Sequence, residues 1–228
     1  VRAHKSGEAH FHDADYFIQR IHNCDLINLE DMLQNGTVIT ETQITKPNSF
    51  ATAANVATQI IAQVASNQYG GQTFSLAHLA PFVDVSRKKN IAFLNETIDK
   101  AIDKIAILGK LLKPIIDKVK QPLVEFIAEE LLKKEIKAGI QTIQYQLVTL
   151  MTTNGQTPFV SMFMYINEVP EGQTRDDLVM LIEEVLRQRI KGLPNEKGHW
   201  ITPAFPKLLY VLDDNNTYEG SDYYYLTE

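Results

Sequence analysis

The chain has 228 residues, 44% of them hydrophobic, which is enough for one substantial core. A net charge of −6 argues against a basic surface for nucleic acid, and no apolar run approaches the ~20 residues of a membrane span. The single cysteine, Cys24, excludes an internal disulfide framework and indicates a reducing, cytoplasmic setting. The start lacks Met and the end resembles a helix entry, so we expect a piece of a longer protein.

Polar and apolar residues alternate over residues 7–13, which predicts a short strand with Glu8, His10 and His12 on one face. A histidine pair on one face can bind a metal or position an anionic substrate. It can equally be satisfied by the neighbouring backbone. No third ligand follows at a recognised spacing, so we predict no metal site.

A thiol follows an amide at Asn23-Cys24, before a short helix that ends at Asn35-Gly36. The thiol of Cys24 can be a proton donor or redox group, or a small buried hydrophobe. Residues 40–50 are polar and predict a loop. Asn48 or Ser49 can cap the next helix.

Residues 51–67 predict a helix, because small apolar residues recur at helical spacing. A stripe of amides, four residues apart, runs along one of its faces: Asn55, Gln59, Gln63 and Asn67. Amides donate and accept, which suits them to read the edge of a base, but they can also interlock two helices. Residues 74–150 are expected to be mostly helical, with breaks near Pro114 and Pro122 and a solvated charged face.

A polar turn at residues 154–158 precedes a nearly continuous apolar run at 159–166, which is typical of a strand in a parallel sheet. Asn154 and Gln156 in this turn can contact a ligand or simply close a capped connection. A helix over 174–191, which ends at Gly192, and a strand over 207–212 follow. Helices that alternate with buried strands predict an α/β fold with its sites at the strand ends.

Six segments, in order, resemble the anaerobic (class III) ribonucleoside-triphosphate reductases, which are glycyl-radical enzymes. They cover almost the whole chain except the helical stretch near 91–138. The matching segments are residues 7–16 (GEAHFHDADY), 23–29 (NCDLINL), 62–71 (AQVASNQYGG), 79–83 (LAPFV), 153–160 (TNGQTPFV) and 205–208 (FPKL).

The resemblance implies a ten-stranded α/β barrel made of two parallel halves, of which residues 1–228 would supply about one half with its helical covering. It places an ATP-binding regulatory domain before this region. The thiyl-radical cysteine, the glycyl-radical site and a zinc site would lie after it. We therefore expect this chain alone to be inactive, although its parent would reduce ribonucleoside triphosphates to deoxyribonucleoside triphosphates for DNA synthesis.

The same resemblance implies roles for individual residues. Cys24 matches the family's second active-site cysteine, which would protonate the departing 2′-hydroxyl group. His10 would lie in the same cavity and assist in proton transfer. The expected substrate-binding residues are His12, Asn23, Asn154 and Gln156. Formate is the expected reductant, although some members use a thiol protein.

The helix over 51–67 resembles the family's dimer-interface helix, and Gln59 matches a position at the site for dNTP or ATP effectors. Thr45 and Asn48 depart from the acidic and basic residues of relatives, so the mode of effector recognition is open. The implied partners are a second copy of the chain and a radical-SAM activating protein with an iron–sulfur cluster.

Two other interpretations stay open from the sequence. One is a different glycyl-radical barrel, such as a formate-lyase-like enzyme, although the segment from His10 to Asp13 favours the reductase. The other is a non-enzymatic module for helical dimerisation or nucleotide sensing, which would depend on the helix over 51–67.

Overall fold

A four-stranded parallel sheet forms the centre of the molecule in the computed structural model, which describes residues 2–10, 22–68, 70–104, 106–152, 155 and 157–228. The strands lie in the order β1-β4-β5-β8, and every neighbouring pair is parallel. Their bounds are β1 (Asp25–Leu26), β4 (Gln72–Ser75), β5 (Val160–Met164) and β8 (Lys207–Tyr210). The predicted α/β class and the two apolar strands are confirmed, whereas β1 and β4 are too short to show a strand pattern in the sequence.

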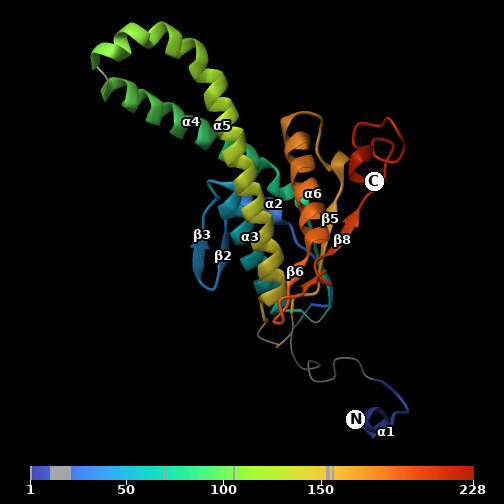
Figure 1. The fold of residues 1–228 in the computed structure, drawn as a ribbon. Coiled ribbons are helices and arrows are strands. Elements are labelled where there is room, and N and C mark those ends of the chain that lie inside the picture. The colour runs from blue at the N-terminus through green and yellow to red at the C-terminus, as the bar shows by residue number, and fades with distance from the viewer. Residues whose placement is uncertain (1, 11–21, 69, 105, 153–154, 156) are drawn as a thin grey trace.

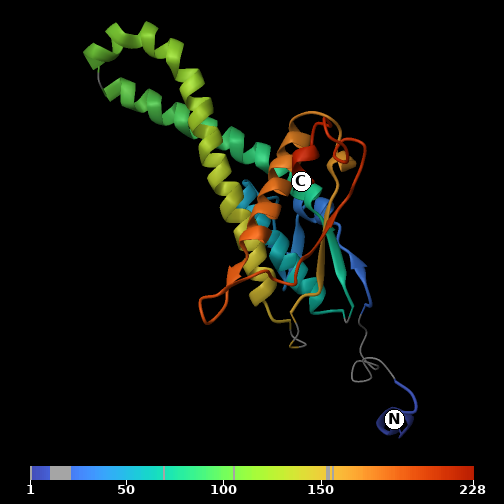
Figure 2. The ribbon, with the colours of Figure 1, turned by 45° about the vertical axis from the view of Figure 1, so that its right-hand side comes forward.

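Helices cover one face of this sheet (Figure 2). They are α3 (Phe50–Ala65), α5 (Ala106–Thr149) and α6 (Gln173–Lys191). Burial alternates along β5, with Val160, Met162 and Met164 buried in the core that these helices share, and Ser161 and Phe163 partly exposed. Within the described residues the buried run is therefore covered on one face, and not on both as its composition predicted.

The opposite face of the sheet carries no helix within the described residues (Figure 2). The register aligns Leu26, Thr73, Ser161 and Lys207 across the four strands on this face. Leu26 is 86% exposed. We call this surface the open face.

The helix α3 begins where predicted, because the Ser49 hydroxyl accepts a hydrogen bond from the Thr52 amide and so caps it. Its small residues let α5 approach closely. A Cβ atom at Gly139 of α5 would lie 2.5 Å from a ring carbon of Phe50. Gly139 therefore sets the spacing of the two helices.

Two long helices, α4 (Pro81–Lys104) and α5, form a hairpin that projects from the body (Figure 1). The prediction of breaks near Pro114 and Pro122 was wrong, because α5 runs without interruption from residue 106 to residue 149. The helix instead curves over its outer part (Figure 1). Curvature absorbs the clash and the missing hydrogen bond of a proline where solvent can hydrate the freed carbonyl.

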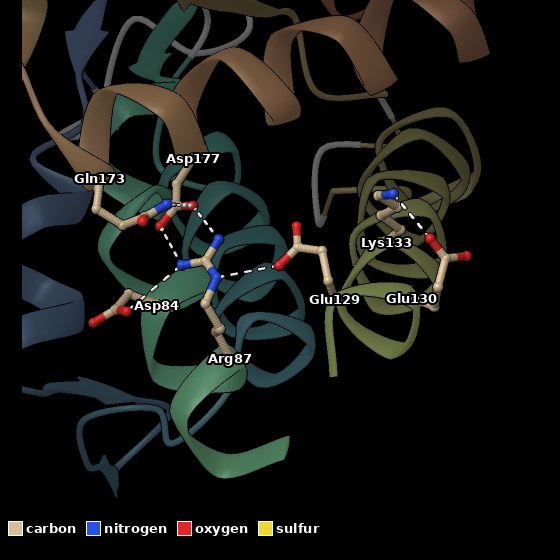
Figure 3. A network of polar contacts seen from close by, with 7 residues as sticks. All are labelled: Asp84, Arg87, Glu129, Glu130, Lys133, Gln173 and Asp177. Carbon is tan, nitrogen blue, oxygen red and sulfur yellow. Dashed lines mark hydrogen bonds and ion pairs between the residues drawn. The ribbon is translucent and has the colours of Figure 1, made fainter. Parts of the chain in front are cut away.

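Arg87 joins this hairpin to α6 through a network of ion pairs (Figure 3). Its guanidinium donates to both oxygens of Asp177, which is fully buried, and to Glu129 on α5 at 3.3 Å. Gln173 donates to Asp177 as well, at 3.0 Å. Burial opposes the charge on Arg87, but Asp177 and Glu129 raise its pKa above the ordinary value.

Two predictions near the N-terminus were wrong. Residues 7–10 form a turn after α1 (Arg2–Ser6) and not a strand, and residues 11–13 lie outside the described part. The polar segment at 40–50 is not simply a loop, because residues 37–44 form the hairpin of β2 (Thr37–Ile39) and β3 (Thr42–Ile44). Its turn residues, Thr40 and Glu41, have positive φ angles, and neither residue type signals such a turn.

The remaining elements are short. They are α2 (Leu29–Gln34), β6 (Leu193–Pro194), β7 (Trp200–Ile201) and the 3-10 helices η1 (Leu76–Leu79), η2 (Ile166–Glu168) and η3 (Tyr224–Leu226). In the described part of the chain, no helix has a stretch long and apolar enough to cross a membrane.

Candidate functional site

Four segments that are far apart in the sequence meet where the strands begin. Asn23-Cys24 precedes β1, Gly70-Gly71 precedes β4, Phe159 precedes β5 and Phe205-Pro206 precedes β8. Because the strands are parallel, their entry segments all lie at one edge of the sheet, which we call the amino edge. The sequence predicted sites at the strand ends, whereas most of the segments that carry the family resemblance converge here, where the strands begin.

The thiol of Cys24 lies exposed at this edge and not in the core. Its Sγ atom donates to the Asn23 side-chain oxygen at 3.5 Å, which makes Asn23 its neighbour in space as well as in sequence. The alternative of a small buried hydrophobe is therefore wrong. An accessible thiol can exchange a proton with a bound ligand.

The backbone holds Cys24 in place. The Asp25 amide donates to the Gly71 carbonyl at 3.1 Å, and the Gln68 side chain donates to the carbonyls of Asn23 and Gly71 at 3.3 and 2.9 Å. At Gly70, a Cβ atom would lie 2.2 Å from the Asn23 carbonyl oxygen. Gly70 is thus required for the close approach of the two chains, and Gln68, which the sequence reasoning missed, braces them.

Two aromatic rings and a lysine side chain also lie at the amino edge. The rings of Phe159 and Phe205 lie 4.7 Å apart, and the Lys207 ammonium lies 4.8 Å from the Phe159 ring centroid. A Cβ atom at Gly71 would touch Phe159 at 2.8 Å, so this ring abuts the chain that supports Cys24. Lys207 is exposed and can attract an anionic ligand. It lies in the matching segment 205–208, but the sequence predicted no role for it.

The other predicted site residues are placed only in part. His10 follows α1, which lies apart from the sheet in both views (Figures 1 and 2), and its ring lies 5.2 Å from that of His4. The structure therefore does not bring His10 beside Cys24. His12, Asn154 and Gln156 lie outside the described residues, and their roles stay predictions. Among the described residues, no group of three or more His, Cys, Asp or Glu could hold a metal ion.

The opposite edge, where the strands end, holds a polar cluster around Asp213. Its carboxylate accepts hydrogen bonds from Asn167 at 2.7 Å, from the Asp214 amide at 2.7 Å and from the Tyr165 hydroxyl at 3.1 Å. These bonds lower the pKa of Asp213, and the bond to Asp213 raises the pKa of Tyr165. The cluster stabilises the turn after β8 and lines an open pocket of about 610 Å³.

Much of the amide stripe on α3 lines a separate groove of about 460 Å³. Gln59 and Gln63 lie exposed in it, beside Asn55. The groove also receives Gln146 from α5, whose side chain donates to the Asn55 side-chain oxygen at 3.2 Å. Asn55 therefore interlocks α3 with α5, as one interpretation of the stripe expected. Gln59 faces the groove, and its role in reading a base stays a prediction.

Comparison with known proteins shows which family the chain belongs to. The family model for the anaerobic ribonucleoside-triphosphate reductases matches residues 1–228. The chain is 35% identical over 215 residues to the anaerobic ribonucleoside-triphosphate reductase of Haemophilus influenzae and 34% identical over 225 residues to that of Escherichia coli. These matches include 93% and 97% of this chain, but only 26% and 27% of the two relatives. The chain thus spans about a quarter of their length.

A solved structure has the same fold. It is the anaerobic ribonucleotide reductase from Thermotoga maritima with dATP bound in the specificity site. The TM-score is 0.54 with 15% sequence identity, and the match covers 92% of this chain and 32% of that one. The likeness supports the fold alone, in which a parallel sheet with helices on one face forms part of an α/β barrel.

Proposed function

The chain belongs to the anaerobic ribonucleoside-triphosphate reductase family, and we propose that it is the part of such an enzyme that carries one active-site thiol and an effector groove. The parent protein would convert ribonucleoside triphosphates to their 2′-deoxy forms. One observation carries the proposal: the Cys24 thiol is exposed at the amino edge, where four of the segments that resemble the family meet.

Cys24 would act as a general acid. The 2′-hydroxyl group of ribose is a poor leaving group, and a proton delivered from Sγ lets it depart as water. The backbone bonds from Asp25 and the side-chain bonds from Gln68 hold the thiol at a fixed place, as proton transfer requires. Lys207, at the same edge, would attract the negatively charged nucleotide.

The remaining chemistry would come from outside this chain. The glycyl radical, formed by a radical-SAM activating protein with an iron–sulfur cluster, would supply hydrogen-atom abstraction from the ribose, and formate would supply the reducing equivalents. The zinc site would lie there too.

The groove on α3 would bind a nucleotide effector, either a dNTP or ATP. Gln59 matches the family's effector position and is exposed in the groove. The face of α3 that bears this stripe would lie near a second copy of the chain in a homodimer. Gln59→Ala in the complete enzyme should then change which ribonucleotide is preferred with each effector more than it changes the maximal rate.

The experiment uses the complete protein, activated anaerobically and supplied with ribonucleoside triphosphates and formate. We expect deoxyribonucleotides from the wild type and a loss of about 10²–10⁴-fold in Cys24→Ser, the range typical of a general acid. The variant should keep its glycyl-radical signal in electron paramagnetic resonance. Full turnover in Cys24→Ser would contradict the role of Cys24, and a wild type that forms no deoxyribonucleotide would contradict the reductase.

A further inference from the structure

Three side chains at the base of the effector groove form a hydrogen-bonded chain. The hydroxyl of Thr58 contacts the Gln146 side-chain oxygen, and the Gln146 nitrogen donates to the Asn55 oxygen at 3.2 Å. Thr58 is fully buried, Gln146 is partly buried and Asn55 is exposed. The chain therefore runs from the core between α3 and α5 out to the groove.

Thr58 allows two arrangements of this chain. Its hydroxyl lies within hydrogen-bond distance of two acceptors, the Gln146 oxygen and the Asn55 backbone carbonyl, which is 2.7 Å away. A hydroxyl has one hydrogen and can donate to only one acceptor at a time, but it can also accept. Thr58 can consequently serve Gln146 as a donor or as an acceptor.

In the first arrangement Thr58 donates to the Gln146 oxygen, and the Gln146 nitrogen donates to the Asn55 oxygen. Asn55 then offers its NH₂ group to a ligand in the groove. In the second arrangement, Thr58 donates to the backbone carbonyl of Asn55 and accepts from the Gln146 side-chain nitrogen. Both amides are turned over, the Gln146 oxygen accepts from Asn55, and Asn55 offers its oxygen instead. Every polar group within the chain is satisfied either way, so neither arrangement carries the cost of an unpaired buried group.

Resting on the proposed effector groove, we infer that this chain selects between two classes of nucleotide base. Adenine and cytosine carry an amino group at the edge where guanine and thymine carry a carbonyl. An amino base requires the Asn55 oxygen, and a keto base requires the Asn55 NH₂ group. The direction of the hydrogen bonds through Gln146 decides which group Asn55 offers, and thus makes Gln146 a specificity-determining residue that need not touch the ligand.

The test replaces Gln146 by glutamate in the complete protein. A carboxylate only accepts, so it takes hydrogen bonds from both Thr58 and Asn55. Asn55 is then held with its oxygen toward the groove, as it is in the second arrangement. The dissociation constants of dATP, dCTP, dGTP and dTTP are measured by equilibrium dialysis. We expect the ratio of keto to amino dissociation constants to rise about tenfold in Gln146→Glu, as one hydrogen bond replaced by a mismatch would give.

The matched control is Gln141→Glu, which makes the same change of charge on the same helix but outside the groove. Its ratio should stay within about twofold of the wild type. A second variant, Thr58→Val, keeps the buried shape and removes the hydroxyl. It should bring the dissociation constants of the two base classes closer together, because the Gln146 amide loses the partner that orients it.

Two failures are distinguishable. If Gln59→Ala weakens effector binding but Gln146→Glu weakens all four nucleotides by one common factor, the inference is overturned and the effector groove stands. The same holds if Thr58→Val leaves the ratios between the nucleotides unaltered. If Gln59→Ala leaves all four dissociation constants unchanged, the groove is not the effector site, and the inference falls with it.

Discussion

Arg87 on α4 and Asp177 on α6 form a two-point ion pair between elements 90 residues apart in the sequence. One contact joins Nη1 to Oδ2 at 3.1 Å, and the other joins Nη2 to Oδ1. Asp177 has no exposed surface, and the Arg87 side chain is 15% exposed. The pair therefore ties the base of the projecting hairpin to a helix that packs on the sheet.

Replacing Arg87 by leucine should destabilise this junction by about 3 kcal/mol, because it leaves the Asp177 carboxylate buried without its counter-charge. Hydrogen exchange of the α4 and α6 backbone amides in the complete protein measures the effect. Their exchange should accelerate about 100-fold. The control, Arg187→Leu, breaks an exposed pair with Glu183 on α6 and should leave the exchange rates nearly unchanged. Equal effects of the two substitutions would contradict a special role for Arg87.

Gly70→Ala should displace the segment that carries Cys24, because the new methyl group would meet the Asn23 carbonyl at 2.2 Å. The complete enzyme should lose at least about tenfold in kcat while its effector affinities change much less, since neither Asn23 nor Gly70 lines the groove on α3. Steady-state kinetics and effector dialysis on one preparation separate the two. A variant with an unchanged kcat would mean that the position of Cys24 does not limit the reaction.

The cluster around Asp213 should make stability depend on pH in the acidic range. Its folded pKa is lowered by the bonds from Asn167, the Asp214 amide and Tyr165, so the native state favours the carboxylate. This contribution is complete above the ordinary aspartate pKa of about 3.9 and disappears as the pH falls through the lowered value. The difference in Tm between the wild type and Asp213→Asn should be constant above about pH 5 and shrink below pH 4. A difference that grows on acidification would show that the sign is wrong.

The isolated 228-residue chain should be inactive and prone to aggregation. The open face exposes Leu26 and Leu209, and both edge strands of the sheet, β1 and β8, have unpaired sides in the described part of the chain. Exposed edges and apolar surface favour association between copies. Size-exclusion chromatography and a thermal melt provide the measurement. A soluble monomer with one sharp transition would contradict the expectation that the open face is normally covered.

Elements with a strong local signal were predictable. The helix α3 has a serine cap and small apolar residues at helical spacing, and β5 is a continuous apolar run, so both have the predicted type. The strands β1 and β4 were missed, because β1 has only two residues and β4 is polar at all positions except Phe74. Their pairing depends on neighbours that are remote in the sequence. The two prolines of α5 led to a wrong prediction of helix breaks. A helix that can bend in solvent tolerates a proline in spite of its low helix propensity.

The candidate site was predictable to a different degree. The resemblance singled out Cys24 and Gln59, and the structure finds the one at the amino edge and the other in a groove. The roles of Gln68, Gln146 and Lys207 were missed, although Gln68 and Lys207 lie in matching segments. Each acts through a partner at least 45 residues away in the sequence. Their roles follow from contacts in space, which the spacing of residues along the sequence does not reveal.

The hairpin of α4 and α5 is also the connection between two adjacent strands, because residues 76–159 separate β4 from β5. During folding, the strands can pair only after this long loop has closed, whereas each helix forms from local contacts within microseconds. The hairpin shortens the effective loop, since its two antiparallel helices carry the chain out to the tip and back to the sheet (Figure 1). Variants that weaken the junction at Arg87 should therefore slow the assembly of the sheet as well as loosen the finished protein.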